Sequence, residues 1–344
     1  MSKEFTRREV MKTAMHGAAY VAPVVLATAV PLGVGAVTAP PVPFPVSLFA
    51  SGTATRTKPD SITSDGQNIY VGYQNTTAAD GSDGGSSTIV AYTAAGQEIR
   101  SFTVQGRCDG LRFNPVTRLL WATVNEDANS SLFTIDPNTG ATTQYTFSSA
   151  PHGGGYDDLA FVNGMAFVAA SNPSNLINGV NTAPAVAKVV LNGTTATLTP
   201  VLLGNATVTD AITNRPVTLN LLDPDSMAID LSGNLVLVSQ ADSQIIIIQN
   251  PGGVNQSASV LTVNMQLDDI AWASTSTGRL FVVDANKNTI SIIRSTGGFT
   301  PGTVYTEVAP DTGTGLVGTL DLRTGSVFQI VNGFTKPTGL IFVP

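Results

Sequence analysis

Cysteine is almost absent from this sequence, since Cys108 is the only one in 344 residues. A single cysteine excludes an internal disulfide framework. Charged residues make up only 12% of the chain, and the 24 acidic residues outnumber the 17 Lys and Arg, which gives a net charge of -7. An acidic chain of this kind is not expected to bind nucleic acid or anionic membranes.

Long hydrophobic runs are also missing, apart from a weakly apolar stretch near the N-terminus. The segment Thr6-Arg7-Arg8-Glu9-Val10-Met11-Lys12 before it resembles the twin-arginine export motif. Pro23 and Pro31 interrupt the apolar stretch, which disfavours a stable membrane-spanning helix. We therefore predict that residues 1–39 are an export signal of a bacterial cell, with a Sec signal or an uncleaved anchor as the alternatives. Residues 40–344 are then expected to form a single domain.

What the rest of the chain does contain is a repeated phrase: an Asp, a small or apolar residue, an apolar run, a tight turn and a second apolar run. Copies are centred on Asp60, Asp109, Asp158, Asp225 and Asp269, and residues 337–343 form a sixth copy without the acid. Strand-turn-strand units that recur at about fifty residues are typical of a β-propeller. The abundance of Thr, Ser, Asn, Gly and Val also favours strands over helices.

Each repeat continues into a second expected hairpin, so that a repeat supplies four strands. These second hairpins are expected at residues 88–104, 132–147, 185–202, 244–263, 289–308 and 316–333. The prediction is an all-β, six-bladed β-propeller of four-stranded blades, with seven blades as the alternative. The last repeat lacks a partner strand between residues 308 and 316, so we expect residues 46–50 to complete the closing blade and remove an exposed sheet edge.

The repeated acids suggest a metal site. The innermost strand of each propeller blade starts at one face, so Asp60, Asp109, Asp158, Asp225 and Asp269 should surround one mouth of the central channel. Carboxylates this close repel one another unless they are protonated or neutralised by a cation. Oxygen ligands without Cys or a His cluster favour Ca²⁺ over zinc. The alternative is that the acids cap turns by accepting bonds from nearby backbone N–H groups.

The inner hairpin at residues 224–238 resembles those of two related propeller groups. One group carries the NHL-type repeat, and the other is the senescence-marker protein and gluconolactonase group of metal-dependent lactonases and esterases. The second resemblance implies that Asp225 matches the family's Asp ligand and that Asp60 stands at the position of its Glu. Asp109 and Asp158 would occupy the positions of two Asn ligands, which is a departure from the family pattern.

His152 lies in the Gly-rich segment 150–156 that leads to the third inner strand. Beside a metal-bound water it could act as a general base or acid together with Asp225, whereas the alternative is a surface-loop histidine. The predicted function is a divalent-cation-dependent lactonase or esterase acting on a small-molecule ester or lactone. Two alternatives are a non-catalytic NHL-type scaffold that binds a peptide or glycan, and a lyase resembling the streptogramin-inactivating propellers.

Overall fold

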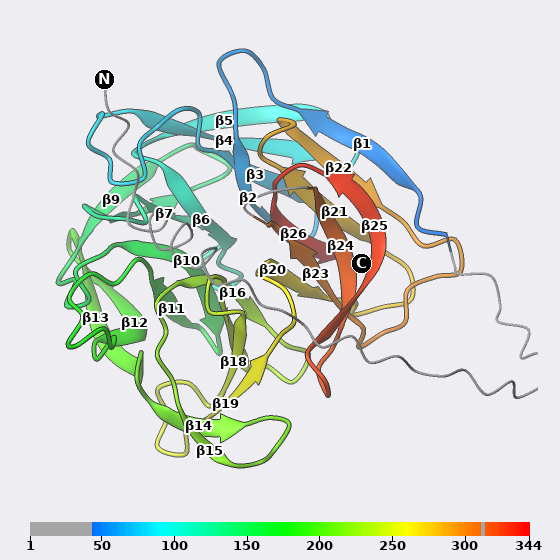
Figure 1. The fold of residues 1–344 in the computed structure, drawn as a ribbon. Helices are drawn as coiled ribbons and strands as arrows, with labels where there is room; N and C mark the ends of the chain where they lie inside the picture. The colour runs from blue at the N-terminus through cyan, green and yellow to red at the C-terminus, as the bar shows by residue number, and fades with distance from the viewer. Residues whose placement is uncertain (1–42, 311–313) are drawn as a thin grey trace, which may run out of the picture.

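The computed structural model describes residues 43–310 and 314–344, and the predicted export signal at 1–39 lies outside them. The described residues form twenty-six strands and no helix (Figure 1). Accordingly, no helix in these two ranges is long and apolar enough to cross a membrane.

The first three blades follow the chain in simple order, each from its innermost to its outermost strand. Blade 1 contains β2 (Pro59–Ser64), β3 (Asn68–Tyr73), β4 (Ser86–Thr93) and β5 (Glu98–Gln105). Blade 2 contains β6 (Cys108–Phe113), β7 (Leu120–Val124), β8 (Ser131–Ile135) and β9 (Thr142–Phe147). Blade 3 contains β10 (Tyr156–Val162), β11 (Met165–Ala170), β12 (Pro184–Asn192) and β13 (Thr195–Leu203), and β13 pairs with β9 of blade 2.

The other three blades include an added hairpin and strands that are distant in sequence. Blade 4 contains β16 (Pro224–Ile229), β17 (Leu235–Ser239), β18 (Gln244–Gln249) and β19 (Ser257–Thr262), extended by β14 (Thr207–Asp210) and β15 (Pro216–Thr218). Blade 5 contains β20 (Leu267–Trp272), β23 (Val304–Val308), β24 (Gly315–Asp321) and β25 (Ser326–Phe334). Blade 6 contains β26 (Pro337–Val343), β21 (Arg279–Asp284), β22 (Thr289–Ile293) and β1 (Val46–Ser51).

The six innermost strands contact one another in a closed ring, as Figure 1 shows around β2, β6, β10, β16, β20 and β26. The hydrophobic core is divided in the same way, because each of its six clusters lies between two neighbouring blades. A blade therefore buries both faces only when its neighbours are present. The predicted all-β propeller class is confirmed.

Blades 5 and 6 differ from the sequence prediction. The expected hairpin from Asp269 to Val282 does not form, because β20 pairs with β23, whereas β21 pairs with β26. The expected hairpin at residues 289–308 is absent from the described sheets for the same reason, since β22 and β23 lie in different blades. The strand β26 does not pair with β25, which precedes it in the sequence. It pairs instead with β21 of the hairpin formed by β21 and β22.

The expected closing strand is confirmed. β1 pairs with β22 at the outer edge of blade 6, so the two ends of the described chain meet in one sheet. The side chain of Phe49 anchors β1, because its ring packs edge-on against Phe281 at 5.0 Å and against Tyr92 at 5.7 Å between ring centroids.

We predict that Phe49→Ala weakens the closing blade. Removing a half-buried aromatic side chain should lower the free energy of unfolding by about 2 to 3 kcal/mol, measured by urea denaturation. Leu48→Ala is the matched control, since Leu48 is 64% exposed and should change stability by less than about 0.5 kcal/mol. Equal losses in the two variants would contradict the anchoring role.

Candidate functional site

A β-bulge interrupts every inner strand near its start. The strand register shifts at the same point in all six blades, and each shift leaves two adjacent inner-strand residues in the bulge. The first bulge residues are Asp60, Asp109, Asp157, Asp225, Asp268 and Thr338. The second bulge residues are Ser61, Gly110, Asp158, Ser226, Asp269 and Gly339.

This register corrects the predicted acid ring. Asp60, Asp109 and Asp225 occupy equivalent positions, but the equivalents in blades 3 and 5 are Asp157 and Asp268. Asp158 and Asp269 lie one residue further along their strands. The predicted set of five aspartates therefore belongs to two successive levels of the channel.

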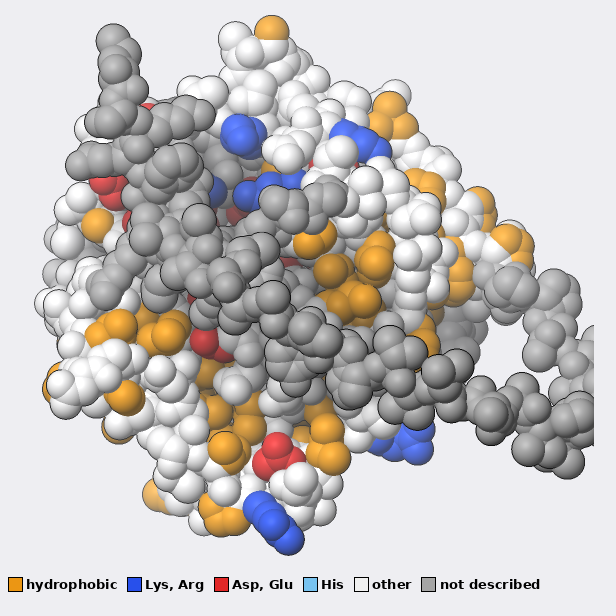
Figure 2. Space-filling model, in the orientation of Figure 1, with side chains coloured by type: hydrophobic (Ala, Val, Ile, Leu, Met, Phe, Trp, Pro, Cys, Tyr) orange, Lys and Arg blue, Asp and Glu red, His pale blue; other side chains and the backbone are white. Residues whose placement is uncertain are grey.

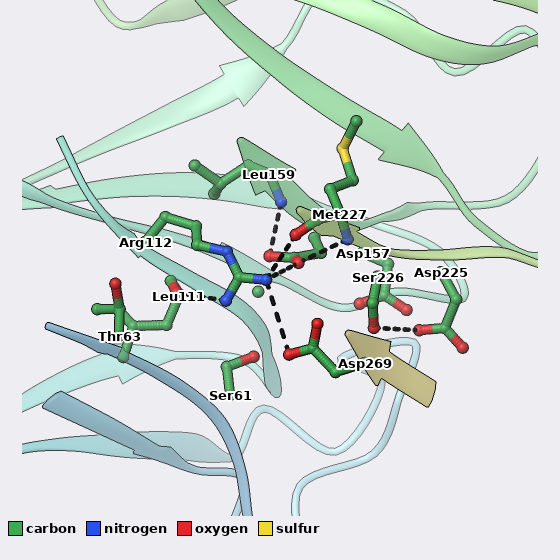
Figure 3. A network of polar contacts seen from close by, with 12 residues as sticks. Ser61, Thr63, Leu111, Arg112, Asp157, Leu159, Asp225, Ser226, Met227 and Asp269 are labelled. Carbon is green, nitrogen blue, oxygen red and sulfur yellow. Dashed lines mark hydrogen bonds and ion pairs between the residues drawn. The ribbon is translucent and has the colours of Figure 1, made fainter. Parts of the chain in front are cut away.

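We call the level of the first bulge residues the upper level and that of the second bulge residues the lower level. Arg112 lies at the lower level, beside Asp158 and Asp269 (Figure 3). Its Nη2 atom lies 2.5 Å from Asp158 Oδ2 and 3.8 Å from Asp269 Oδ2. The same atom donates a hydrogen bond to the carbonyl oxygen of Met227 at 2.7 Å, and Nη1 donates to that of Ile62 at 3.3 Å. One guanidinium thus joins blade 2 to the inner strands of blades 1, 3, 4 and 5 and lies across the channel.

The two acids beside Arg112 also hold neighbouring blades together. Asp158 Oδ2 accepts a hydrogen bond from the backbone N–H of Met227 at 2.9 Å, and Asp269 Oδ2 accepts one from Leu340 at 3.2 Å. Burial raises the pKa of Asp158 and raises that of Asp269 to about 6, although Arg112 opposes both shifts. Burial disfavours the charge on Arg112, but the facing acids outweigh this and raise the pKa of Arg112.

At the upper level, Asp109 is surrounded by hydrogen-bond donors and an arginine. Its Oδ1 accepts a bond from Gln74 Nε2 at 2.9 Å and lies 3.1 Å from Arg107 Nε, while Oδ2 accepts the backbone N–H of Glu126 at 3.2 Å. Arg107 Nη2 also lies 3.5 Å from Glu126 Oε1. Burial and the charge of Glu126 raise the pKa of Asp109 well above its usual range.

Asp60 is the partly exposed acid of this level. Burial and the charge of Asp268 raise the pKa of Asp60 strongly, and Arg107 and Lys336 oppose the shift. Asp268 Oδ2 accepts a hydrogen bond from Gln240 Nε2 at 2.9 Å, and Asp225 Oδ1 lies 3.5 Å from the hydroxyl of Ser226. Figure 2 shows acidic side chains around the middle of the ring on the face that it presents.

The predicted five-aspartate calcium site does not fit these contacts. Within residues 43–310 and 314–344, no three Asp, Glu, His or Cys side chains are grouped so that they could hold a metal ion. The oxygens of Asp109, Asp158 and Asp269 already accept N–H groups or face arginine. For these three acids the alternative of bonding to backbone N–H groups describes the structure better.

His152 is fully buried, so it is not a surface-loop histidine. Its Nε2 lies 2.7 Å from the carbonyl oxygen of Gly155, its ring packs edge-on against Tyr156 at 5.1 Å, and burial lowers its pKa. A Cβ on Gly154 would stand 2.1 Å from the carbonyl oxygen of Ser171. Gly154 therefore allows close packing around His152, and proton transfer by His152 would require this loop to open.

Sequence reasoning missed Arg112 and Glu307. Arg112 is the single Lys or Arg in the six inner strands of the described residues. A lone cation in an expected inner strand could have indicated a partner for the repeated acids. Glu307 lies in β23, whose place in blade 5 depends on pairing with the distant strand β20.

Comparisons with known protein families and with curated proteins find no match. A streptogramin B lyase structure is similar to this chain with a TM-score of 0.50 and 14% identity, over 87% of this chain and 91% of that one. The periplasmic gluconolactonase of Pseudomonas aeruginosa gives 0.45 and 11%, over 83% and 88%. A protein of unknown function from Bacteroides caccae gives 0.47 and 12%, over 83% and 86%. At such identities the similarity concerns the fold alone.

We predict that Arg112→Met destabilises the ring strongly. Two buried acids would lose their cation, which should lower the free energy of unfolding by about 3 to 5 kcal/mol in urea denaturation. Adding Asp158→Asn should recover part of the loss. Arg118→Met is the control, because Arg118 is exposed and its guanidinium lies over the Phe113 ring, and the change should cost less than about 1 kcal/mol. A small effect of Arg112→Met would show that the guanidinium is dispensable.

Stability should rise as the pH falls from 7 towards 4. Burial raises the folded-state pKa of Asp269 to about 6, above that of an exposed aspartate, so folding favours the protonated acid. This contribution is complete below the unfolded pKa and is lost as the pH rises through about 6. A difference of this size between the folded and unfolded pKa corresponds to about 3 kcal/mol. Melting curves in EDTA should show this slope, and Asp269→Asn should reduce it. A slope of the opposite sign would contradict the conclusion that burial disfavours the charged form of Asp269.

Proposed function

We propose that the upper level of the channel is the active site of an enzyme that opens ester bonds, with hydroxyl-rich lactones as the favoured substrates. The observation that carries this proposal is the partly exposed Asp60 at the mouth, on the opposite side of the ring from Asp225. Two carboxyl groups on opposite sides of a channel can serve as acid and base on one bound molecule.

The composition of the mouth supports the substrate class. Carboxylates from blades 1, 2, 4 and 5 and the side-chain amides of Gln74 and Gln240 surround the opening, while Arg112 closes the channel beneath. Such groups accept hydrogen bonds from hydroxyls at several positions of a small polar molecule. A sugar lactone offers these hydroxyls together with an ester bond.

The two acids have different roles in the proposal. Asp60 is the candidate acid, because burial and the charge of Asp268 raise its pKa and favour its protonated form. Asp225 takes a proton from water, whose oxygen bonds to the carbonyl carbon. The bond to the leaving oxygen then breaks, and Asp60 donates its proton to that oxygen.

Three further points bear on this assignment. The buried position of His152 favours carboxyl groups over the imidazole as proton carriers. The likeness to a streptogramin B lyase makes elimination the second reaction to consider, because a lyase breaks the bond without adding water. The paired arginines at residues 7 and 8 support an exported location.

Asp60→Asn should lower turnover of the best substrate by about 10²- to 10⁴-fold, because a general acid typically contributes that much. The assay would use sugar lactones, aliphatic lactones and aryl esters, with product mass distinguishing hydrolysis from elimination. Asp136→Asn, in a turn between β8 and β9, should retain the wild-type rate per folded molecule. If Asp60→Asn turns over as fast as wild type, the assignment fails, and if no substrate reacts, a binding propeller of NHL type becomes the better account.

A further inference from the structure

His152 has an unusual position for an ionisable side chain, because it is fully buried in a connection at the mouth end of blade 3. This connection between β9 and β10 contains residues 148–155, and His152 is its only titratable residue. The ring Nε2 lies 2.7 Å from the carbonyl oxygen of Gly155, which can only accept a hydrogen bond. The neutral ring therefore carries its hydrogen on Nε2, and Nδ1 carries none.

The nitrogen Nδ1 is buried and has no hydrogen-bond partner among the residues that the structure describes. Protonation of the ring would place a second N–H group on Nδ1 and a positive charge in the interior. Burial therefore lowers the pKa of His152, although the carbonyl oxygens of Gly155 and Ser171 oppose this shift. The buried position is compatible with the neutral ring and disfavours the charged one.

Charged side chains on the segments around the ring do not compensate a proton on His152. The connection between β11 and β12, residues 171–183, contains no titratable residue. Tyr156 of β10 lies edge-on to the ring, and burial raises its pKa, so it stays neutral. The acids on the adjoining segments are Glu126, Asp127, Asp157 and Asp158. None of these four acids is among the causes of the pKa shift of His152.

Backbone hydrogen bonds fix the connection of His152 to the neighbouring connection between β11 and β12. The carbonyl oxygen of His152 accepts the N–H groups of Ser174 and Asn175, each at 2.8 Å. The N–H group of Ser171 donates to the carbonyl oxygen of Gly155 at 3.0 Å. If the connection opened, these three bonds would break together, because all of their acceptors lie on it.

The same connection also reaches the upper level of the channel. The N–H group of Gly155 donates to the carbonyl oxygen of Glu126 at 3.1 Å. The N–H group of Glu126 in turn donates to Asp109 Oδ2 at 3.2 Å. His152 is thus connected through Gly155 and Glu126 to an acid of the upper level.

We propose that residues 148–155 form an acid-sensitive latch of the mouth, which is closed over neutral His152 and opens when the ring takes up a proton. In the open form water hydrates the imidazolium and both of its N–H groups. The inference concerns the rim of the mouth, so it does not depend on the proposed ester-opening activity.

The direction of the pH effect follows from the two forms of the latch. A histidine exposed to water has a pKa of about 6.5, and the closed form lowers this pKa. The closed latch is therefore most stable above about pH 6.5 and loses stability as the pH falls towards the pKa of the closed form. This direction is opposite to the one predicted for Asp269, so acid opens the latch while it stabilises the ring.

Amide hydrogen exchange of the purified full chain at about pH 7.5 and about pH 5 tests the latch, after correction for the intrinsic pH dependence of exchange. Protection of the N–H groups of Ser171, Ser174 and Asn175 should fall by up to about tenfold for each pH unit below about 6.5. The N–H groups of Gln240 and Ser243, in a mouth connection of blade 4 without histidine, should keep their protection.

Two variants separate the histidine from the acids of the rim. His152→Gln cannot titrate and keeps a side-chain N–H group for the carbonyl oxygen of Gly155, so its protection should no longer fall in acid. Asp127→Asn is the matched control, because Asp127 Oδ1 accepts a hydrogen bond from Asn172 Nδ2 at 3.0 Å on the same rim. It should keep the pH response of the wild type.

Exchange of the C2 hydrogen of the His152 ring, followed by mass spectrometry of its peptide, measures the titration in the wild-type chain without any variant. Its midpoint should lie below about 6.5. A midpoint at or above that value would overturn the latch, and so would equal protection at the two pH values or an equal loss in the blade 4 connection. A pH response that persists in His152→Gln, or that disappears in Asp127→Asn, would assign it to the carboxylates and overturn the latch as well.

Discussion

The ion pair between Arg112 and Asp158 is the interaction on which the centre of this propeller depends. A propeller of six blades brings six inner strands together around an axis, and each strand presents backbone carbonyls there that water would otherwise solvate. The guanidinium has five N–H donors in one plane, so a single side chain can reach Met227 O, Ile62 O and two carboxylates at once. Because these partners belong to four other blades, the position of Arg112 requires the whole ring to be assembled.

The bulges explain why acids gather at one end of the channel. A bulge leaves one or two residues per inner strand without a cross-strand partner, and a short acceptor such as Asp can then bind a backbone N–H within the strand or in the next blade. Asp158 and Asp269 do so towards Met227 and Leu340. The acids at the first bulge position lie at the mouth instead, where Asp109 and Asp268 accept bonds from the side-chain amides of Gln74 and Gln240. The same local geometry therefore produces structural acids at one level and candidate reactive acids at the level above.

The repeat spacing was sufficient to predict the class of fold, because strand-turn-strand phrases carry their own hydrophobic pattern and turn residues. It was insufficient to separate Asp157 from Asp158 or Asp268 from Asp269, since adjacent acids fit one phrase equally well and only the strand register distinguishes them. Strand exchange between blades 5 and 6 was missed for a related reason. The pairing of β20 with β23 joins segments about thirty residues apart, and local patterns contain no information about which of two apolar strands will be the neighbour.

The contacts of individual acids also change what the ring can do. Acids spaced as one ring suggested one shared cation, but Arg112 already supplies the positive charge for Asp158 and Asp269, and Arg107 does so for Asp109. The charge of Asp268 in blade 5 disfavours the ionised forms of Asp60 in blade 1 and of Glu307 in blade 5. The two arginines therefore remove Asp109, Asp158 and Asp269 from the single shared site that the sequence suggested.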